Sequence, residues 1–242
     1  QVFTEAQQQE ITKIVHDYLL KNPQILVQVA AALQKQQETQ WQNTANKTVP
    51  ALAQPLFGDP LSPVIGNPAG KITLVEFLDY QCPHCKEMGP QVAALIKANP
   101  ELRVIIKELP IFGENSEFAA KAALAAAKQG KFLAMHNALL GAQGRLTRDI
   151  VLKTAQKLGL NIKLLQNDTQ DKDLTASLKT NSDLAQKLNF NGTPAFVIAQ
   201  VALDSKTGKV TKVAQAVLIP GAVSESMLAE AVSQVQAGKV QE

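Results

Sequence analysis

The chain has 242 residues, 45% hydrophobic and 19% charged, which supplies enough apolar material for one large domain or one domain with an appendage. Its net charge of +3 is mild and its basic residues are dispersed, so we expect neither a nucleic-acid partner nor a membrane-surface partner. The alanine-rich stretch 119–127 is interrupted by Lys121 and falls short of the roughly 18 apolar residues that a membrane-spanning helix needs.

Residues 1–45 are predicted to form two amphipathic helices. The first begins at a Thr4 N-cap and ends near residue 20, with apolar side chains on one face: Ile11, Ile14, Val15, Tyr18 and Leu19. Asn22-Pro23 separates it from a second helix, which ends in glutamines and has its own apolar face of Ile25, Leu26, Val29 and Leu33. Gln1-Val2-Phe3 shows neither an initiator Met nor an apolar signal core, and we expect it to be the end of a processed, mature chain.

Two short amphipathic helices cannot bury their apolar faces on each other alone, so this segment needs a further surface. It either folds back on the rest of its own chain or pairs with other copies, and we favour a homo-oligomer. Among oligomers we favour a dimer over a trimer, because closed two-fold assemblies are the commonest.

Residues 46–68 are predicted to be a linker that leads into a large C-terminal domain, residues 69–242. The segment is rich in residues that break helices and strands: Pro50, Pro55, Gly58, Pro60, Pro63, Gly66 and Pro68. Such a density of prolines favours an extended, semi-rigid path.

The most informative stretch follows this linker. Residues 72–78 are almost continuously apolar, which is typical of a central strand buried on both faces. They lead into a turn with Cys82 and Cys85, the only two cysteines of the chain, at the start of a helix. Such a pair can close as a disulfide, and the helix N-terminus favours the thiolate of its first sulfur. The pattern therefore indicates a redox centre.

Three other uses of the cysteine pair fit the sequence less well. A structural zinc site needs about four Cys or His ligands, but His16 and His136 are remote and have no partner at ligand spacing, so we expect no metal. Attachment of a c-type haem requires His directly after the second cysteine, where Lys86 stands. A purely structural disulfide would close so short a loop that it would add little stability.

The rest of the chain completes an α/β domain. A helix from Pro83 to about residue 99, followed by a strand over 102–109, predicts a strand–helix–strand unit with a parallel strand pair. About eighty residues of helical pattern follow, in which Met135 and His136 are expected to be core or rim residues. Two further strands, 195–199 and 213–218, are predicted to form a hairpin, and Ser224 begins the last helix.

The motif Cys82-Pro83-His84-Cys85 after an apolar strand, with a Gly-Thr-Pro sequence at 192–194 before another, resembles the DsbA family of thiol:disulfide oxidoreductases. The resemblance covers about residues 59–242 and implies a thioredoxin fold with a helical insertion at about 114–189. Residues 1–58 lie outside a minimal DsbA and resemble the helical extensions of its oligomeric relatives. The expected fold class is therefore α/β, a thioredoxin fold with a helical insertion and an N-terminal helical extension.

Within the motif, the resemblance implies that Cys82 is the nucleophile and Cys85 the resolving thiol. Of the two residues between them, Pro83 and His84, the histidine is expected to favour the Cys82 thiolate through a positive charge or an N–H group, which would make the disulfide more oxidising. The alternative is a bystander histidine.

Glu76 and the Thr193-Pro194 loop are the other candidate site residues. Glu76 is either a strand residue that faces solvent or a buried carboxylate beneath the cysteines that relays protons; the family keeps an acidic residue at this position, which favours the second. Pro194 is either in a cis bond that holds the loop against the cysteines and offers Thr193 to a substrate peptide, or a trans proline at the start of an edge strand. Asp79 and Tyr80 are expected to be loop structure.

We expect a thiol:disulfide oxidoreductase that introduces disulfide bonds into exported proteins, with no cofactor. Its partners would be cysteine-containing unfolded or misfolded proteins and a membrane redox partner that resets the cysteine pair. The resemblance implies the periplasm, the bacterial cell envelope, as its location. The alternatives are a disulfide isomerase or reductase of the oligomeric type, and a holdase chaperone with little redox turnover.

Overall fold

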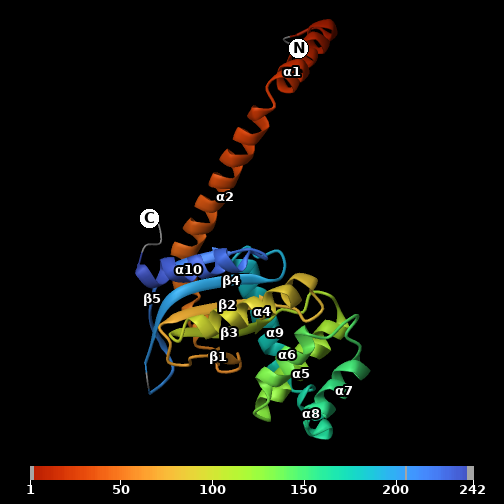
Figure 1. Cartoon of the computed structure of the whole chain (residues 1–242), viewed down its shortest axis with the longest axis vertical. Coiled ribbons are helices and arrows are strands. Elements are labelled where there is room, and N and C mark those ends of the chain that lie inside the picture. Colours follow the sequence, from red (N-terminus) through yellow and green to blue (C-terminus); the bar gives the residue numbers. More distant parts are fainter. Residues whose placement is uncertain (1–2, 205, 239–242) are drawn as a thin grey trace. The chain divides into compact units, whose positions relative to one another are not determined.

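The computed structural model describes residues 3–204 and 206–238, and the chain divides into two compact units, Gln1–Asn43 and Thr44–Glu242 (Figure 1). Gln1, Val2 and Ser205 lie outside the described residues, and with them parts of the predicted processed end and of the predicted hairpin turn. Within these described ranges, none of the helices combines the length and the apolar character of a membrane span.

The first helix of the N-terminal unit is α1 (Glu5–Lys21), which begins at the predicted cap. The hydroxyl of Thr4 accepts a hydrogen bond from the Gln7 N–H at 3.4 Å, and the Gln7 side chain accepts one from the Thr4 N–H at 2.9 Å. This capping box satisfies two N–H groups that a helix start leaves without partners. The helix ends at Asn22, as predicted, and α2 (Gln24–Ala51) follows.

The prediction of an extended path over residues 46–68 is wrong for its first half. The helix α2 continues to Ala51, and a short helix α3 (Ala53–Phe57) follows, with buried apolar side chains at Ala45, Val49, Leu56 and Phe57. Pro55 is tolerated because it stands in the first turn of α3, where its missing N–H would have no helical partner, and Pro50 stands inside the last turn of α2.

A five-stranded sheet forms the centre of the C-terminal unit, in the order β1-β3-β2-β4-β5 (Figure 1). The strands are β1 (Val64–Gly66), β2 (Ile72–Leu78), β3 (Leu102–Glu108), β4 (Ala195–Leu203) and β5 (Val210–Ile219). Strands β2 and β3 are parallel, and the other pairs are antiparallel. The predicted parallel pair and the β4–β5 hairpin are confirmed, whereas β1 lies in the segment that was expected to be linker.

Helices cover both faces of this sheet. On one face, α4 (Pro83–Ala98) and α10 (Glu225–Ala237) contact the sheet and each other. On the other face lie α3 and the end of α9 (Lys172–Lys187), where the Phe190 ring meets the Phe77 ring of β2 edge to face at 5.5 Å between centroids. Covering on both faces explains why every residue of β2 and β3 is buried.

Helices fill the chain between β3 and β4. They are α5 (Glu114–Lys128), α6 (Phe132–Leu140), α7 (Arg148–Lys157), α8 (Ile162–Asp168) and α9. Local capping sets three of their starts, because Thr147, Asn161 and Asp171 each accept a hydrogen bond from a backbone N–H of the first turn. This sheet with its covering and inserted helices confirms the predicted α/β fold class.

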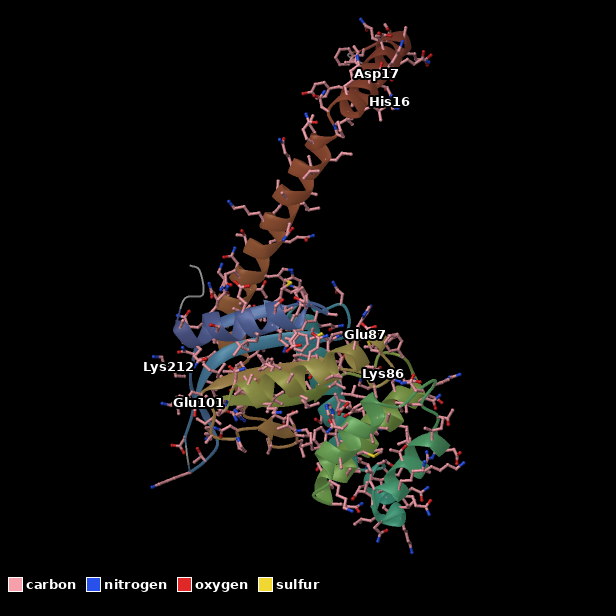
Figure 2. The ribbon with its side chains drawn as sticks, in the orientation of Figure 1. His16, Asp17, Lys86, Glu87, Glu101 and Lys212 are labelled. Atoms are coloured by element: carbon pink, nitrogen blue, oxygen red, sulfur yellow. The ribbon has the colours of Figure 1, made fainter. Side chains whose placement is uncertain are left out.

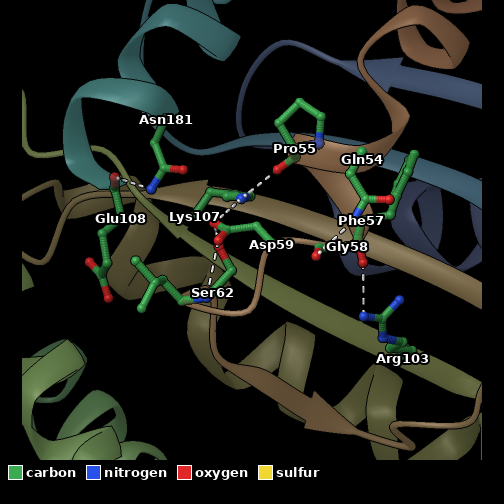
Figure 3. A network of polar contacts seen from close by, with 11 residues as sticks. Gln54, Pro55, Phe57, Gly58, Asp59, Ser62, Arg103, Lys107, Glu108 and Asn181 are labelled. Carbon is green, nitrogen blue, oxygen red and sulfur yellow. Dashed lines mark hydrogen bonds and ion pairs between the residues drawn. The ribbon is translucent and has the colours of Figure 1, made fainter. Parts of the chain in front are cut away.

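One buried ion pair ties the segment after α3 to the sheet (Figure 3). The Lys107 ammonium lies 2.8 Å from Asp59 Oδ2 and donates to the carbonyl oxygen of Pro55 at 2.7 Å, and the Ser62 hydroxyl donates to the same Asp59 oxygen. Burial opposes ionisation of Asp59, but the charge and hydrogen bond of Lys107 outweigh it and hold its pKa below the ordinary value. Nearby, Arg103 donates to the carbonyl oxygen of Phe57 at 2.9 Å.

We predict that Asp59→Asn lowers the free energy of unfolding by about 3 kcal/mol, because it leaves the Lys107 ammonium buried without its counter-charge. The matched control is Asp183→Asn, which breaks the exposed Lys179–Asp183 pair at 3.1 Å and is expected to cost less than about 1 kcal/mol. Urea denaturation of the full chain measures both. Equal losses for the two variants would contradict the anchoring role of Lys107.

Candidate active site

The end of β2 places the first cysteine at a helix start. The strand stops at Leu78, residues 79–81 turn, and Cys82 is the N-cap of α4, with Pro83 at its first position. Proline suits this position because its fixed φ matches a helix and the N–H that it lacks has no helical partner there. Cys82 keeps 3% of its surface exposed, while Cys85, one turn further, is fully buried, and both are free thiols.

A loop before β4 closes over the cysteines. The antiparallel register pairs Phe77 with Ala195, so the residues just before Ala195 lie beside the active-site turn. The Thr193-Pro194 bond is cis, which excludes the trans alternative, and Cys82 Sγ lies 3.2 Å from the carbonyl oxygen of Thr193. Two segments 111 residues apart in sequence therefore meet at the reactive sulfur.

The surroundings of Cys82 favour its thiolate. The Cys85 thiol, which donates to the Cys82 sulfur, is the main cause; Thr193 and the backbone N–H groups of His84 and Cys85 add to it, and together they outweigh burial and lower the Cys82 pKa to about 5. The same hydrogen bond, with burial, raises the pKa of Cys85 far above its ordinary value. The Cys82 sulfur is thus the charged one, and the more deeply buried Cys85 sulfur holds the proton.

The thiolate also links the stability of the reduced protein to pH. A pKa that is lower in the folded state than in the unfolded state stabilises the folded form. For Cys82 this stabilisation is complete above the ordinary thiol value of 9.0 and is lost as the pH falls through about 5.

His84 lies at the surface of the motif. Its ring Nδ1 is 3.2 Å from Glu87 Oε2, and both side chains are well exposed. In this arrangement His84 supports the Cys82 thiolate through its backbone N–H, and the predicted influence of its ring stays a prediction. The neighbouring Lys86 joins α4 to the inserted helices, because its ammonium donates to the Ala142 carbonyl at 2.7 Å; Figure 2 shows Lys86 and Glu87 at the same end of α4.

Glu76 is a buried carboxyl group on the cysteine side of the sheet, so the alternative of a solvent-facing residue is wrong. It is 1% exposed, and it shares a face of β2 with Leu74 and Leu78, which pack in the same core as Cys82 and Cys85. Its Oε1 has no hydrogen-bond partner within the described part of the chain. Burial raises its pKa to about 8, so Glu76 carries a proton at neutral pH.

A second buried polar group beside the turn escaped the sequence analysis. The Tyr80 hydroxyl donates to Glu108 Oε1 at 2.7 Å and lies 3.0 Å from His136 Nδ1. Burial lowers the pKa of His136 to about 4 and raises the pKa of Glu108 well above its ordinary value. His136 is a core residue, as expected, but Tyr80 does more than form a loop. The sequence could have indicated Glu108, because in a predicted parallel pair the end of β3 lies beside the end of β2.

The turn is flanked by an exposed apolar segment. Ile111 and Phe112, which follow β3, are 47% and 52% exposed, and their backbone N–H groups donate to the carboxylate of Asp79, three residues before Cys82. Large apolar side chains that stay exposed beside a reactive group offer a surface to a polypeptide.

The structure thus brings most of the candidate residues together: the two cysteines, Pro83, Thr193 and Pro194 surround one sulfur, and Glu76 lies in the core behind it. The described residues contain no group of three or more His, Cys, Asp or Glu side chains that could hold a metal ion.

A dithiol whose outer sulfur is ionised and whose inner sulfur is protonated has the chemistry that disulfide exchange requires, and the fold and the site together define a thioredoxin-like protein. Comparison with known proteins agrees. Residues 73–233 match the family described as DSBA-like thioredoxin domain, and the chain belongs to this family. Residues 7–40 match the Copper resistance protein ScsC N-terminal domain.

Solved structures show the same relationship. A thioredoxin-like oxidoreductase from Silicibacter pomeroyi is 42% identical, with a TM-score of 0.67 over 76% of this chain and 97% of that one. A periplasmic thioredoxin-like protein from Salmonella enterica serovar Typhimurium is 34% identical, with a TM-score of 0.65 over 77% and 97%. Salmonella enterica Typhimurium BcfH is 32% identical, with a TM-score of 0.70 over 96% of each chain.

The chain spans only a part of the curated relatives that match first. A Na(+)/H(+) antiporter NhaA 3 of Salinispora tropica is 31% identical over 137 residues, which are 56% of this chain and 21% of the antiporter.

We predict that alkylation of Cys82 in the reduced protein rises with pH around a midpoint near 5 and is constant at pH 7, because only the thiolate reacts. In Cys85→Ala the midpoint rises, since the strongest donor to the sulfur is lost. Thiolate absorbance and iodoacetamide kinetics measure both. A midpoint near 8.5 in the wild type, the value of an ordinary cysteine, would contradict the stabilised thiolate.

Proposed function

We propose that this protein introduces disulfide bonds into exported proteins, with Cys82 as the nucleophile and Cys85 as the resolving thiol. The observation that carries the proposal is the asymmetry of the pair: the outer sulfur is stabilised as a thiolate and the inner sulfur as a thiol. A stabilised thiolate stabilises the reduced form, so the disulfide form tends to accept electrons from its clients.

In the proposed reaction a client thiolate attacks Cys82 in the Cys82–Cys85 disulfide. A client–Cys82 bond forms, the Cys82–Cys85 bond breaks, and Cys85 leaves with the electron pair and takes up a proton. A second client thiolate then attacks the client sulfur and expels the Cys82 thiolate, so the client is oxidised by two electrons and the pair is reduced. If Cys85 attacks Cys82 instead, the client leaves reduced.

The surrounding residues support these steps. Glu76 carries a proton at neutral pH in the same core as Cys85 and would supply or accept it as Cys85 leaves or attacks. The backbone of Thr193, at the cis-proline loop, would pair with an extended client chain, and the exposed Ile111 and Phe112 would contact its apolar residues. His84, exposed beside Cys82, would add an N–H donor or positive charge during exchange.

We place the protein in the periplasm, where disulfides persist. The Salmonella relative described as periplasmic supports this location. Each round leaves the cysteine pair reduced, so continued oxidation needs a partner that removes two electrons, and a membrane redox partner would reset the pair.

We predict that Cys82→Ser abolishes oxidation of reduced ribonuclease, to the level of buffer alone, because Cys85 alone cannot form the disulfide that the client attacks. Cys85→Ser, mixed with scrambled ribonuclease, is expected to accumulate a client–Cys82 mixed disulfide, visible on a non-reducing gel, because the Cys82 thiolate attacks a client disulfide and no resolving thiol remains. Suppression of client aggregation is measured as well, as a test for holdase activity. It should be equal in the wild type and in Cys82→Ser. Oxidation by Cys82→Ser at the wild-type rate would eliminate the proposed nucleophile.

A disulfide isomerase is the second candidate, and the N-terminal unit favours it. Helix α1 buries none of its residues, and Ile11, Ile14, Val15, Tyr18, Leu26, Val29 and Leu33 are all exposed. At helical spacing these side chains form apolar faces that a second copy of the chain would cover. We propose a homo-oligomer through this segment, a dimer in preference to a trimer, in which several cysteine pairs act on one scrambled client.

We predict that Val29→Asp weakens the oligomer by at least tenfold in its dissociation constant, because it places a charge in the apolar contact. The matched control is Ala31→Asp, nearly opposite on the same helix and also exposed, which should leave the oligomer intact. Light scattering gives the mass, and refolding of scrambled ribonuclease, which should fall only in Val29→Asp, gives the isomerase activity. A wild-type monomer at micromolar concentration would contradict this proposal and favour folding back on the same chain.

A further inference from the structure

Asp79 contacts the active-site turn from several directions. Its side chain is 1% exposed. One carboxylate oxygen accepts the Gln81 N–H at 2.7 Å, and the other accepts the N–H groups of Ile111 at 2.7 Å and Phe112 at 3.2 Å. Its backbone carbonyl accepts the Cys82 N–H at 3.0 Å. Its backbone also hydrogen-bonds the Cys85 sulfur, and this bond favours the thiolate of Cys85.

The Asp79 carboxylate accepts hydrogen bonds just beyond the point where the backbone pairing of β2 and β3 ends. The last backbone bond between the two strands runs from the Leu109 N–H to the Leu78 carbonyl oxygen at 2.8 Å. Beyond it the chain after Leu78 turns away toward Cys82, and residue 110 is a proline, which has no N–H. Asp79 then accepts the next two N–H groups, which would otherwise be left without acceptors.

We propose that Asp79 is a positioning residue of thiol–disulfide exchange: its carboxylate clamps the active-site turn to residues 111–112 and so fixes the donors around the Cys82 sulfur. This inference rests on the function proposed above and names a residue that controls it. Three charge-assisted hydrogen bonds converge on one carboxylate, and each is stronger than a bond between neutral groups. The turn itself comprises only Asp79 to Cys82, so a small movement of Asp79 reaches both cysteines.

A positioning role and a purely electrostatic role of Asp79 predict opposite changes in the Cys82 pKa when its carboxylate is removed. A negative charge near the cysteines disfavours the thiolate, so its removal alone would lower the Cys82 pKa. Loss of the clamp would instead misalign the N–H and S–H donors that stabilise the thiolate, and the Cys82 pKa would rise.

The test is Asp79→Asn in the full chain. This substitution keeps the size of the side chain and replaces one acceptor oxygen with an NH2 group, so at least one of the three N–H donors loses its acceptor. The matched control is Asp204→Asn at the turn after β4, where the carboxylate accepts the N–H groups of Lys206 at 3.1 Å and Thr207 at 2.8 Å. Asp204 stands at the end of β4, whereas the cis-proline loop precedes its start.

We expect Asp79→Asn to raise the Cys82 pKa by about one unit or more and to shift the redox equilibrium with glutathione about tenfold toward the disulfide form. Asp204→Asn should change neither quantity. A fall in thermal stability with an unchanged Cys82 pKa would show a purely structural role and overturn the proposal, and a lowered Cys82 pKa would overturn it in favour of simple electrostatics.

If Asp79→Asn does not fold, amide hydrogen exchange of the wild-type protein tests the role of Asp79 instead. Protection of the Gln81 and Ile111 amides supports the clamp, and exchange of both at free-peptide rates overturns it. The pKa and glutathione measurements need no client. A wild-type protein that fails to oxidise ribonuclease therefore refutes the proposed function, while the response to Asp79→Asn still decides the role of Asp79.

Discussion

The structure depends on holding one sulfur as an anion close to the protein interior. A charge that is nearly removed from water needs donors to replace the water, and Cys82 receives them from the Cys85 thiol and from the first N–H groups of α4. A helix terminus alone supplies at most about 2 kcal/mol, roughly 1.5 pKa units, so the Cys85 thiol is needed as well. The fold brings two segments, the start of α4 and the cis-proline loop, together at this one atom.

Burial opposes the ionisation of two carboxyl groups on the cysteine side of the sheet. The pKa of Glu76 is raised to about 8 by burial, and burial also raises that of Glu108 well above its ordinary value. Protonated at neutral pH, Glu76 adds no negative charge to the core that holds the cysteines, and it remains able to exchange protons. The same desolvation that would make an isolated buried carboxylate costly therefore favours the neutral form of both groups.

The sequence predicted the parts of the site that depend on local order. Strand, turn and helix follow from periodicity, and the spacing of Cys82 and Cys85 indicates redox chemistry before any contact is known. Long-range partners were found where a motif marked them, as at Pro194, but not at Glu108 or His136, whose role appears only when three elements meet at the Tyr80 hydroxyl. The helical path after residue 45 was missed because prolines were read without their positions within a turn.

The last two residues of β3 show why charged residues occur in so buried a strand. Side chains alternate along a strand, so Lys107 and Glu108 serve opposite faces of the sheet. Lys107 anchors the segment after α3 through Asp59 (Figure 3). Glu108 accepts a hydrogen bond from Tyr80, on the cysteine side of the sheet. An adjacent Lys-Glu pair that ends an apolar strand thus indicates a sheet covered on both faces with a polar site on one of them. The register with β2 then identifies that face, because Glu76 and Glu108 alternate in phase with the residues that pack against the cysteines.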